Sequence, residues 1–213
     1  MACKDLVIIG AGGFGREVLW QLQELDQYNI FGFIDDNPSL QGQQVNNTPV
    51  LGDNQWLLRY PKNINAVICV ANPEIRKAIY NELKNNCFIS FPNIIAKDVR
   101  YSDFVKFGQG CIICLSTTIT VNITLGDFVI INPHCAIGHD AVLDDFATLY
   151  YDVNVAGRVH IKSCTEIGTG TNIIQGKTIG ENVIVGAGSV VVKDIPANCT
   201  AVGSPAKPIK FHG

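Results

Sequence analysis

Two adjacent residues, His139 and Asp140, have side chains that could together carry out acid–base chemistry. A carboxylate next to an imidazole can fix which ring nitrogen carries the proton and can stabilise the imidazolium ion. An imidazole titrates near neutral pH, so it is suited to accept a proton during a reaction. The other histidines, His134, His160 and His212, are interpreted as exposed turn residues. His139 with Asp140 is therefore the candidate catalytic pair.

A glycine-rich segment near the N-terminus could bind an anion. The sequence GAGGFG at positions 10–15 follows an apolar run at 5–9 and precedes apolar residues at helical spacing. Free backbone N–H groups and a helix N-terminus favour a phosphate at such a turn. About 20 residues on, Asp35 and Asp36 end the next apolar run, where an acidic residue can bind a ribose hydroxyl. The segment is compatible with a nucleotide phosphate, with NAD, or with glycines that only make a tight turn.

The first 90 residues alternate between strands and helices. Apolar runs predict strands at 5–9, 30–34 and 66–71, and the spacing of apolar residues predicts helices at 16–25, 52–59 and 73–83. The polar stretch from 37 to 48 is expected to be a loop. Such alternation predicts a small parallel sheet covered by helices. We therefore expect a Rossmann-like α/β domain over residues 1–90.

A different period organises the rest of the chain. From Ile95 onward, every sixth residue is aliphatic or aromatic over 17 positions in succession, and the fourth residue after each of them is mostly small or β-branched, with Lys177 as the exception. For a chain with 47% apolar residues, such a run has a chance on the order of 10⁻⁵. These positions hold Ile95, Tyr101, Phe107, Ile113, Ile119, Leu125, Ile131, Ile137, Leu143, Leu149, Val155, Ile161, Ile167, Ile173, Ile179, Val185 and Val191.

A six-residue period fits neither an α-helix nor a plain strand, but it suits a short strand followed by a turn. Three such units close a triangular coil, so residues 95–196 would form between five and six coils of a parallel β-helix. The outer faces of the coils are flat and carry few charges, so we expect them to be buried against other copies in a homotrimer. This second domain would cover residues 91–213 and end in a closing tail.

Composition excludes several classes of protein. Charged residues make up 16% of the chain and the net charge is −3, which argues against nucleic acid as a partner. No apolar stretch approaches the roughly 18 residues of a membrane span. The eight cysteines show no disulfide spacing and are expected to be small buried side chains in a reducing compartment, which predicts a cytoplasmic protein.

Four segments together carry a resemblance to a known family. They are GAGGFGRE, FIDD, IGHD and the C-terminal hexapeptide run IGENVIVGAGSVVVKDIPANCTAVGSPAKPI. From end to end, the chain resembles the bacterial sialic-acid O-acetyltransferases and their nucleotide-amino-sugar N-acetyltransferase members. The resemblance implies a left-handed β-helix and a homotrimer with active sites between subunits.

The resemblance also implies an activity. Members transfer the acetyl group of acetyl-CoA directly to the amino group of a nucleotide-linked amino-dideoxy sugar, without a metal, in glycan biosynthesis. By resemblance, His139 is the general base and Asp140 raises its basicity. The residues at the family's substrate-binding positions are Gly12, Gly13, Phe14, Asp35, Asp36, Ala71 and Asn132, and those at its coenzyme A positions are Thr148, Gly157, Thr169 and Ala187. Phe14 and Thr148 stand where some members carry histidine.

Three alternatives stay open at this point. The acceptor could be a hydroxyl group of a sugar or a sialic acid instead of an amine. His134 and His139 are five residues apart, as are two zinc ligands in the γ-class carbonic anhydrases, although Asp98 lies where a further histidine would be needed. The chain could also be a non-catalytic nucleotide-sensing trimer that uses the β-helix only for assembly.

Overall fold

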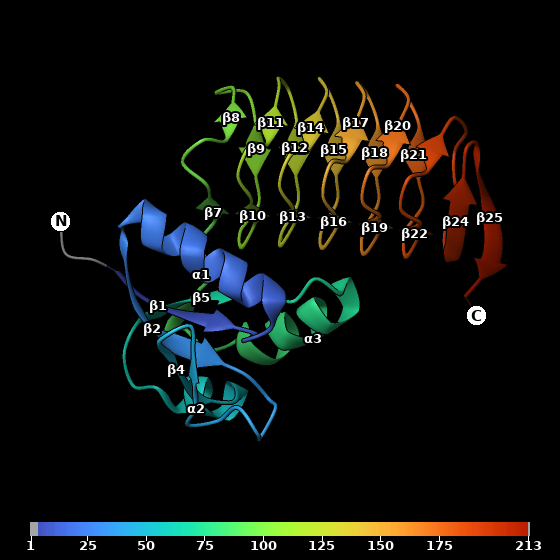
Figure 1. Ribbon diagram of the computed structural model, residues 1–213. Helices are drawn as coiled ribbons and strands as arrows, with labels where there is room; N and C mark the ends of the chain where they lie inside the picture. Colours follow the sequence, from blue (N-terminus) through green and yellow to red (C-terminus); the bar gives the residue numbers. More distant parts are fainter. Residues whose placement is uncertain (1–3, 213) are drawn as a thin grey trace. The chain divides into compact units, whose positions relative to one another are not determined.

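The structure is a computed structural model that describes residues 4–212, and it separates into two compact units with the boundary between Ile94 and Ile95 (Figure 1). The change of sequence period lies near residue 90, a few residues before this boundary. Each unit has its own sheets and its own core.

The N-terminal unit is built on a six-stranded sheet in the order β3-β4-β2-β1-β5-β6. All neighbouring strands are parallel except β3 and β4. The apolar run of β1 lies in the middle of the sheet, where Leu6, Val7 and Ile8 are fully buried. The strands are β1 (Lys4–Ile9), β2 (Tyr28–Ile34), β3 (Gln44–Val45), β4 (Thr48–Gly52), β5 (Ile64–Ile68) and β6 (Ile89–Ser90).

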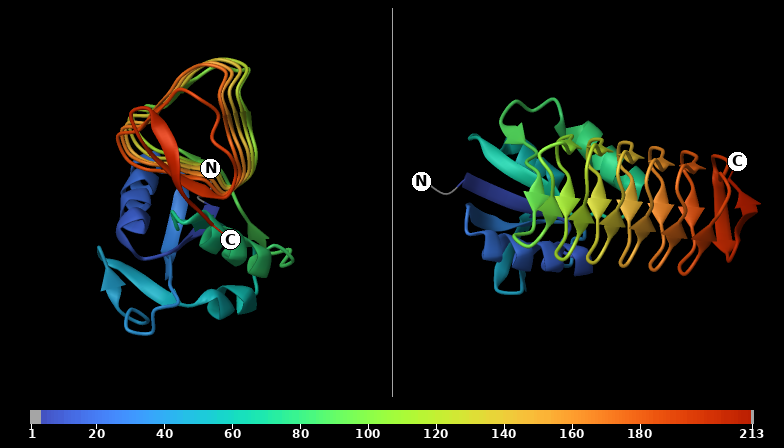
Figure 2. Two further views of the ribbon diagram at one scale, coloured as in Figure 1. Left: turned by 90° about the vertical axis from the view of Figure 1, so that its right-hand side faces the viewer. Right: turned by 90° about the horizontal axis from the view of Figure 1, so that it is seen from above.

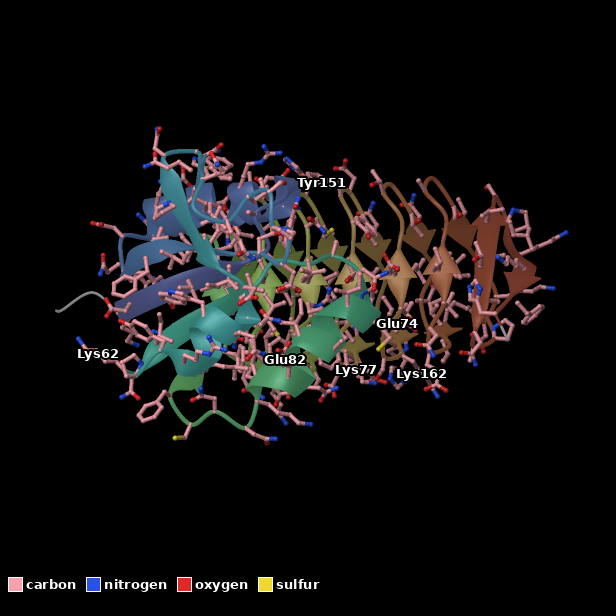
Figure 3. The ribbon with its side chains drawn as sticks, turned by 90° about the horizontal axis from the view of Figure 1, so that it is seen from below. Lys62, Glu74, Lys77, Glu82, Tyr151 and Lys162 are labelled. Atoms are coloured by element: carbon pink, nitrogen blue, oxygen red, sulfur yellow. The ribbon has the colours of Figure 1, made fainter. Side chains whose placement is uncertain are left out.

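Three helices pack on this sheet: α1 (Gly13–Leu25), α2 (Asn54–Arg59) and α3 (Pro73–Leu83). α1 contacts β1 and β2 and buries Val18, Leu19 and Leu22, which share one helical face. The carboxylate of Glu82 ties α3 to α2, because it accepts hydrogen bonds from Asn54 Nδ2 at 2.8 Å and Gln55 Nε2 at 3.1 Å. Figure 3 labels Glu82 on α3.

The sequence prediction missed the strands β3, β4 and β6. Residues 44–45 belong to the stretch expected as a loop, and β4 contains Pro49, which argues against a strand in sequence terms. The proline is accommodated because it lies opposite Gln44 of the two-residue edge strand β3, whereas the pairs of β4 with β2 involve Val50 and Gly52. Strands of two residues, such as β3 and β6, show no readable period.

The C-terminal unit is the predicted parallel β-helix, and its end-on view in Figure 2 shows the triangular coil. Three sheets form its sides, and each strand pairs in register with the strand one coil on, as Ile112 pairs with Ile130 and Ile130 with Thr148. The β7 sheet consists of β7 (Ile94–Ile95), β10 (Ile112–Ile113), β13 (Ile130–Ile131), β16 (Thr148–Leu149), β19 (Glu166–Ile167), β22 (Ile184–Val185), β24 (Cys199–Gly203) and β25 (Ala206–Phe211). The β8 sheet consists of β8 (Arg100–Tyr101), β11 (Thr118–Ile119), β14 (Ala136–Ile137), β17 (Asn154–Val155), β20 (Asn172–Ile173) and β23 (Val190–Val191). The β9 sheet consists of β9 (Lys106–Phe107), β12 (Thr124–Leu125), β15 (Val142–Leu143), β18 (His160–Ile161) and β21 (Thr178–Ile179).

The residues of the six-residue period point inward and form the core of the coil. From Ile113 to Val191 all of them are buried, whereas Tyr101 in the first coil is 49% exposed. The threonines at the small inward position share one repeated contact. Their hydroxyls donate to a carbonyl oxygen 15 residues further along the chain, as Thr165 does to Gly180 at 2.6 Å and Thr171 to Gly186 at 3.3 Å. Ser189 instead donates to Gly186 O of its own coil at 2.6 Å. A buried hydroxyl is therefore satisfied within the coil.

A second regularity concerns the turns. From Phe107 to Val185, the third residue after each inward residue has the left-handed conformation, with φ 56° at Asn122, 59° at Asp140 and 58° at Arg158. Asn and Asp tolerate this conformation better than most residues. The repeat therefore sets the backbone of Asp140 irrespective of any catalytic role.

The chain ends in an antiparallel hairpin, because β25 folds back on β24 at the end of the β7 sheet. No helix within residues 4–212 is long and apolar enough to cross a membrane. The seven cysteines within residues 4–212 form no disulfide; Cys87 is exposed and Cys164 half-buried, so not every cysteine is the buried side chain expected. Cys3 lies outside the described residues, and the cytoplasmic location stays a prediction.

Candidate active site

His139 and Asp140 occupy the turn between β14 and β15. His139 Nδ1 lies 2.7 Å from Asp140 Oδ2, and the two side chains are 52% and 47% exposed. An ionised carboxylate only accepts hydrogen bonds, so this contact assigns the ring proton of the neutral imidazole to Nδ1. The lone pair of Nε2 is then available to accept a proton from a substrate.

The carboxylate of Asp140 has a second partner one coil back. Asn122 Nδ2 donates to Asp140 Oδ1 at 3.2 Å. Hydrogen bonds from His139 and then from Asn122 lower the pKa of Asp140 below its ordinary value of 3.8, since both favour the charged form. Asp140 is therefore a carboxylate at neutral pH.

Gly157 lies directly under the imidazole, one coil further along the chain. A Cβ atom at this position would lie 2.5 Å from His139 Nε2 and 2.6 Å from Cε1. Gly157 is buried, although it stands at a turn. The missing side chain at position 157 therefore makes room for the ring of His139.

A groove of about 450 Å³ runs across the β8 sheet beside this turn. It is lined by outward residues of β11, β14, β17 and β20 and by the turns that follow these strands. Gly138, the neighbour of His139, lines it, and so does Gln175, which lies two coils beyond His139 at the same turn position. Asn154 and Asn172 on its floor are joined by a hydrogen bond of 3.2 Å. An elongated polar molecule could lie here next to the imidazole.

The other residues predicted on the β-helix lie away from this turn. Thr169 and Ala187 are exposed and follow one another in successive coils, at the turn between the β7 and β8 sheets. Asn132 lies at the same kind of turn but is buried, and its Nδ2 donates to Leu149 O at 2.8 Å. Thr148 is fully buried on β16. Gly157, by contrast, lies against the imidazole of His139.

The predicted glycine turn lies between β1 and α1. Gly12 and Gly13 are exposed, a Cβ atom at Gly12 would meet open space, and α1 begins at Gly13 without a side-chain cap. The first N–H groups of a helix have no partner within it, so they are available to an anion. Phe14 is half-buried beside them. Gly15 has a packing role instead, because its Cα lies against the carbonyl of Gly10.

The two acidic residues after β2 differ in their contacts. Asp35 accepts hydrogen bonds from Ala11 N at 2.8 Å and from Asn37 N at 2.9 Å, so it ties the glycine turn to its own loop. Asp36 is exposed and makes no hydrogen bond or ion pair among the described residues. Of the pair, Asp36 has the carboxylate that is free for a ligand.

Sequence reasoning missed three features of these regions. Arg76 on α3 is 1% exposed and donates to Val70 O and Ala71 O at 2.7 and 2.8 Å, which holds the loop after β5 and the predicted binding residue Ala71. The sequence could have indicated its burial, because Arg76 lies two helical turns from the buried Leu83 and therefore on the same face of α3. Asn122 was missed, although it precedes Asp140 by one coil.

The third missed feature is a second histidine–carboxylate pair. His160 Nε2 lies 2.9 Å from both carboxylate oxygens of Asp144, on the β9 sheet. Here the carboxylate contacts Nε2 instead of Nδ1, and neither residue lines the groove. Within residues 4–212, no group of three His, Cys, Asp or Glu side chains could hold a metal ion. His134 and His139 stand at different turns of the coil.

The chain is similar to several known proteins. Residues 5–83 match the family model of the PglD N-terminal domain. A histidine-to-asparagine variant of perosamine N-acetyltransferase from Caulobacter crescentus, solved with CoA and GDP-perosamine, superposes with a TM-score of 0.91 at 28% identity over 98% of each chain. The acetyltransferase domain of PglB from Neisseria gonorrhoeae has a TM-score of 0.88 at 31% identity over 97% of this chain and 100% of that one.

A galactoside O-acetyltransferase from Lactococcus lactis is 32% identical over 145 residues, which is 62% of this chain and 63% of that protein. The chain thus spans less than two thirds of the curated relatives it matches. The fold class is nevertheless defined along the whole chain: a Rossmann-like α/β domain followed by a left-handed parallel β-helix of hexapeptide repeats. Within this class, the chain belongs to the family of hexapeptide-repeat nucleotide-amino-sugar acetyltransferases.

Proposed function

We propose that the protein transfers the acetyl group of acetyl-CoA to the amino group of a nucleotide-linked amino-dideoxy sugar, with His139 as the general base. The observation that carries this proposal is the 2.7 Å contact between His139 Nδ1 and Asp140, which leaves Nε2 free beside the groove. The likeness to a perosamine N-acetyltransferase solved with CoA and GDP-perosamine supports the same substrate classes.

The reaction is a direct transfer. The sugar amine attacks the thioester carbonyl carbon, so that a C–N bond forms, while His139 Nε2 takes a proton from the attacking nitrogen. The C–S bond then breaks and the thiolate of coenzyme A leaves, taking up the proton. Asp140 stabilises the imidazolium ion formed in between. No cysteine nucleophile takes part.

The N-terminal unit would hold the nucleotide. The N–H groups at Gly12 and Gly13 suit the diphosphate, and Asp36 suits a hydroxyl of the ribose. Phe14 and Ala71 would provide further contacts. Coenzyme A would contact Thr169 and Ala187, which are exposed, and the groove. Thr148 and Asn132 are buried, so coenzyme A could contact Thr148, and the acceptor sugar Asn132, only if these side chains became exposed when the ligands bind.

We further propose a homotrimer with the active sites between subunits. Val121, which has the same turn position as His139 in the preceding coil, is 36% exposed, and Ile174 in the groove is 37% exposed. Exposed apolar side chains around a polar site favour contact with another subunit. Thr169 and Ala187 lie at the opposite edge of the β8 sheet from His139, so a neighbouring subunit would bring the two sets together.

The direct test is a thiol-release assay with acetyl-CoA and a panel of UDP-, dTDP- and GDP-linked 4-amino-4,6-dideoxy sugars. Each acceptor is paired with its 4-hydroxy counterpart. We expect release with at least one amino sugar and a product heavier by one acetyl group. Transfer to the hydroxy counterparts only would favour O-acetylation, the alternative suggested by the galactoside O-acetyltransferase relative. Binding of nucleotides without transfer to any acceptor would contradict an acetyltransferase and favour the sensor.

A further inference from the structure

We propose that Asn122 is a positioning residue: its amide holds the Asp140 carboxylate in the orientation in which that carboxylate fixes the tautomer of His139. The kinetic part of this inference rests on the proposed function. Asn122 touches no reacting atom, and it lies one coil away from the pair on which it acts.

The contact divides the carboxylate between two donors. Asn122 Nδ2 donates to Oδ1 at 3.2 Å, and the ring of His139 occupies Oδ2 at 2.7 Å. The amide must present its nitrogen here, because the carboxylate oxygen only accepts. With Oδ1 engaged by a fixed donor, rotation of the carboxylate away from the imidazole breaks a second hydrogen bond.

The register of the β-helix brings these residues together. Asn122 and Asp140 stand one coil apart and have the left-handed conformation at equivalent turns, with φ 56° and 59°. An asparagine at position 122 meets two demands at once, because it tolerates this backbone and has a donor of the right length. A glycine or an aspartate would satisfy the turn equally well, but neither has a side-chain donor.

Arg158 is a charged neighbour of Asp140, but it cannot replace Asn122. Arg158 lies at the equivalent turn one coil on and acts on Asp140 through its charge. Such an attraction has no fixed direction at an exposed position, and salt screens it. The hydrogen bond from Asn122 is directional. Orientation of the carboxylate therefore depends on position 122.

The test compares Asn122→Gly with Asn182→Gly in the full-length protein. Asn182 is a matched control: it is also an exposed asparagine with a left-handed backbone, and its Nδ2 donates to Asn198 Oδ1 at 3.1 Å, away from the groove. Asn122→Asp is the second variant, because it keeps the size and the turn but replaces the donor by an acceptor. Nitrogen-15 NMR of the histidine rings reports the tautomer of His139 whether or not the protein is active.

In the wild type we expect the neutral ring of His139 to carry its proton on Nδ1. In Asn122→Gly we expect a mixture of the two tautomers, and a kcat about three- to tenfold lower with KM for acetyl-CoA unchanged, as for loss of one hydrogen bond. Asn122→Asp should lose at least as much, and Asn182→Gly should behave as wild type. An unchanged tautomer in both Asn122 variants, or an Asn122→Asp variant with wild-type turnover, would overturn the proposal. Absence of turnover in the wild type would instead contradict the proposed function, and the NMR result would still decide the role of Asn122.

Discussion

The imidazole of His139 rests on Gly157, so that a single methyl group at position 157 would meet Nε2 at 2.5 Å. The atoms in the way belong to a surface side chain, which can rotate away. The fold is therefore expected to accept an alanine at this position, while the imidazole cannot stay where it is.

Gly157→Ala should consequently uncouple activity from stability. We expect turnover to fall about tenfold to a hundredfold, since displacement of a catalytic group by about 1 Å has effects of this size. The Tm should stay close to that of the wild type. The control is the same substitution in a His139→Ala background, where the methyl group has no ring to displace and should cost nothing further. Equal losses in both backgrounds would show that Gly157 acts through something other than His139.

The two histidine–carboxylate pairs provide a matched comparison for the general base. His139→Ala should lower turnover by at least about 10²-fold, as expected for removal of a general base. His160→Ala removes an imidazole of similar exposure, 40% against 52%, that also contacts a carboxylate. It should leave turnover within about twofold of the wild type. The turnover of both variants is measured in the thiol-release assay. Binding of acetyl-CoA to each variant shows that it is correctly folded. A large loss in His160→Ala, with little loss in His139→Ala, would reverse the assignment.

The fold was predictable from the sequence because the buried residues show its periods: helical spacing between apolar runs in the first 90 residues, and a six-residue step from Ile95 onward. The six-residue step determined the coil, its register and the position of the turn that carries His139. What failed was local: β4 contains Pro49, and β3 and β6 are too short to show a period. In these places pairing with a neighbouring strand decides the structure, and single-sequence patterns do not contain that information.

The site was predictable to a smaller extent. His139 and Asp140 are adjacent in sequence, so their contact needed no fold. Asn122 and Gly157 reach the pair only through the coil, one coil before Asp140 and one coil after His139, and they would have been found by applying the register to these two residues. The burial of Thr148 and Asn132 could not be predicted from the repeat. Both residues occupy outward positions of the six-residue unit, and in some other units the equivalent positions are exposed.

Substitutions of the two acidic residues after β2 should affect different properties: Asp35→Ala the stability of the fold, and Asp36→Ala the binding of the nucleotide. Asp35 holds two backbone N–H groups, so Asp35→Ala is expected to lower the free energy of unfolding by about 1–3 kcal/mol. Asp36 has no such contact, so Asp36→Ala should change stability by less than about 0.5 kcal/mol. Thermal unfolding with and without GDP or UDP measures both effects. Asp36→Ala should lose most of the nucleotide-induced rise in Tm; if only Asp35→Ala loses it, the assignment of Asp36 to the ligand is wrong.

The alkaline limit of stability should depend on Cys135, whose thiol lies inside the β-helix and donates to Tyr150 O at 3.1 Å. Burial raises the pKa of this thiol from 9.0 to about 12. In the native state the proton is therefore held up to about pH 12, whereas the unfolded chain releases it above about pH 9. Unfolding is favoured as pH rises through this window, by up to about 1.4 kcal/mol per pH unit. Cys135→Ser replaces the thiol donor by a hydroxyl donor that does not titrate in this range. The free energy of unfolding of the variant, measured by urea titration, should therefore fall less steeply between about pH 9 and 10.5 than that of the wild type. Parallel slopes for the two proteins would mean that the thiol is already ionised in the native coil.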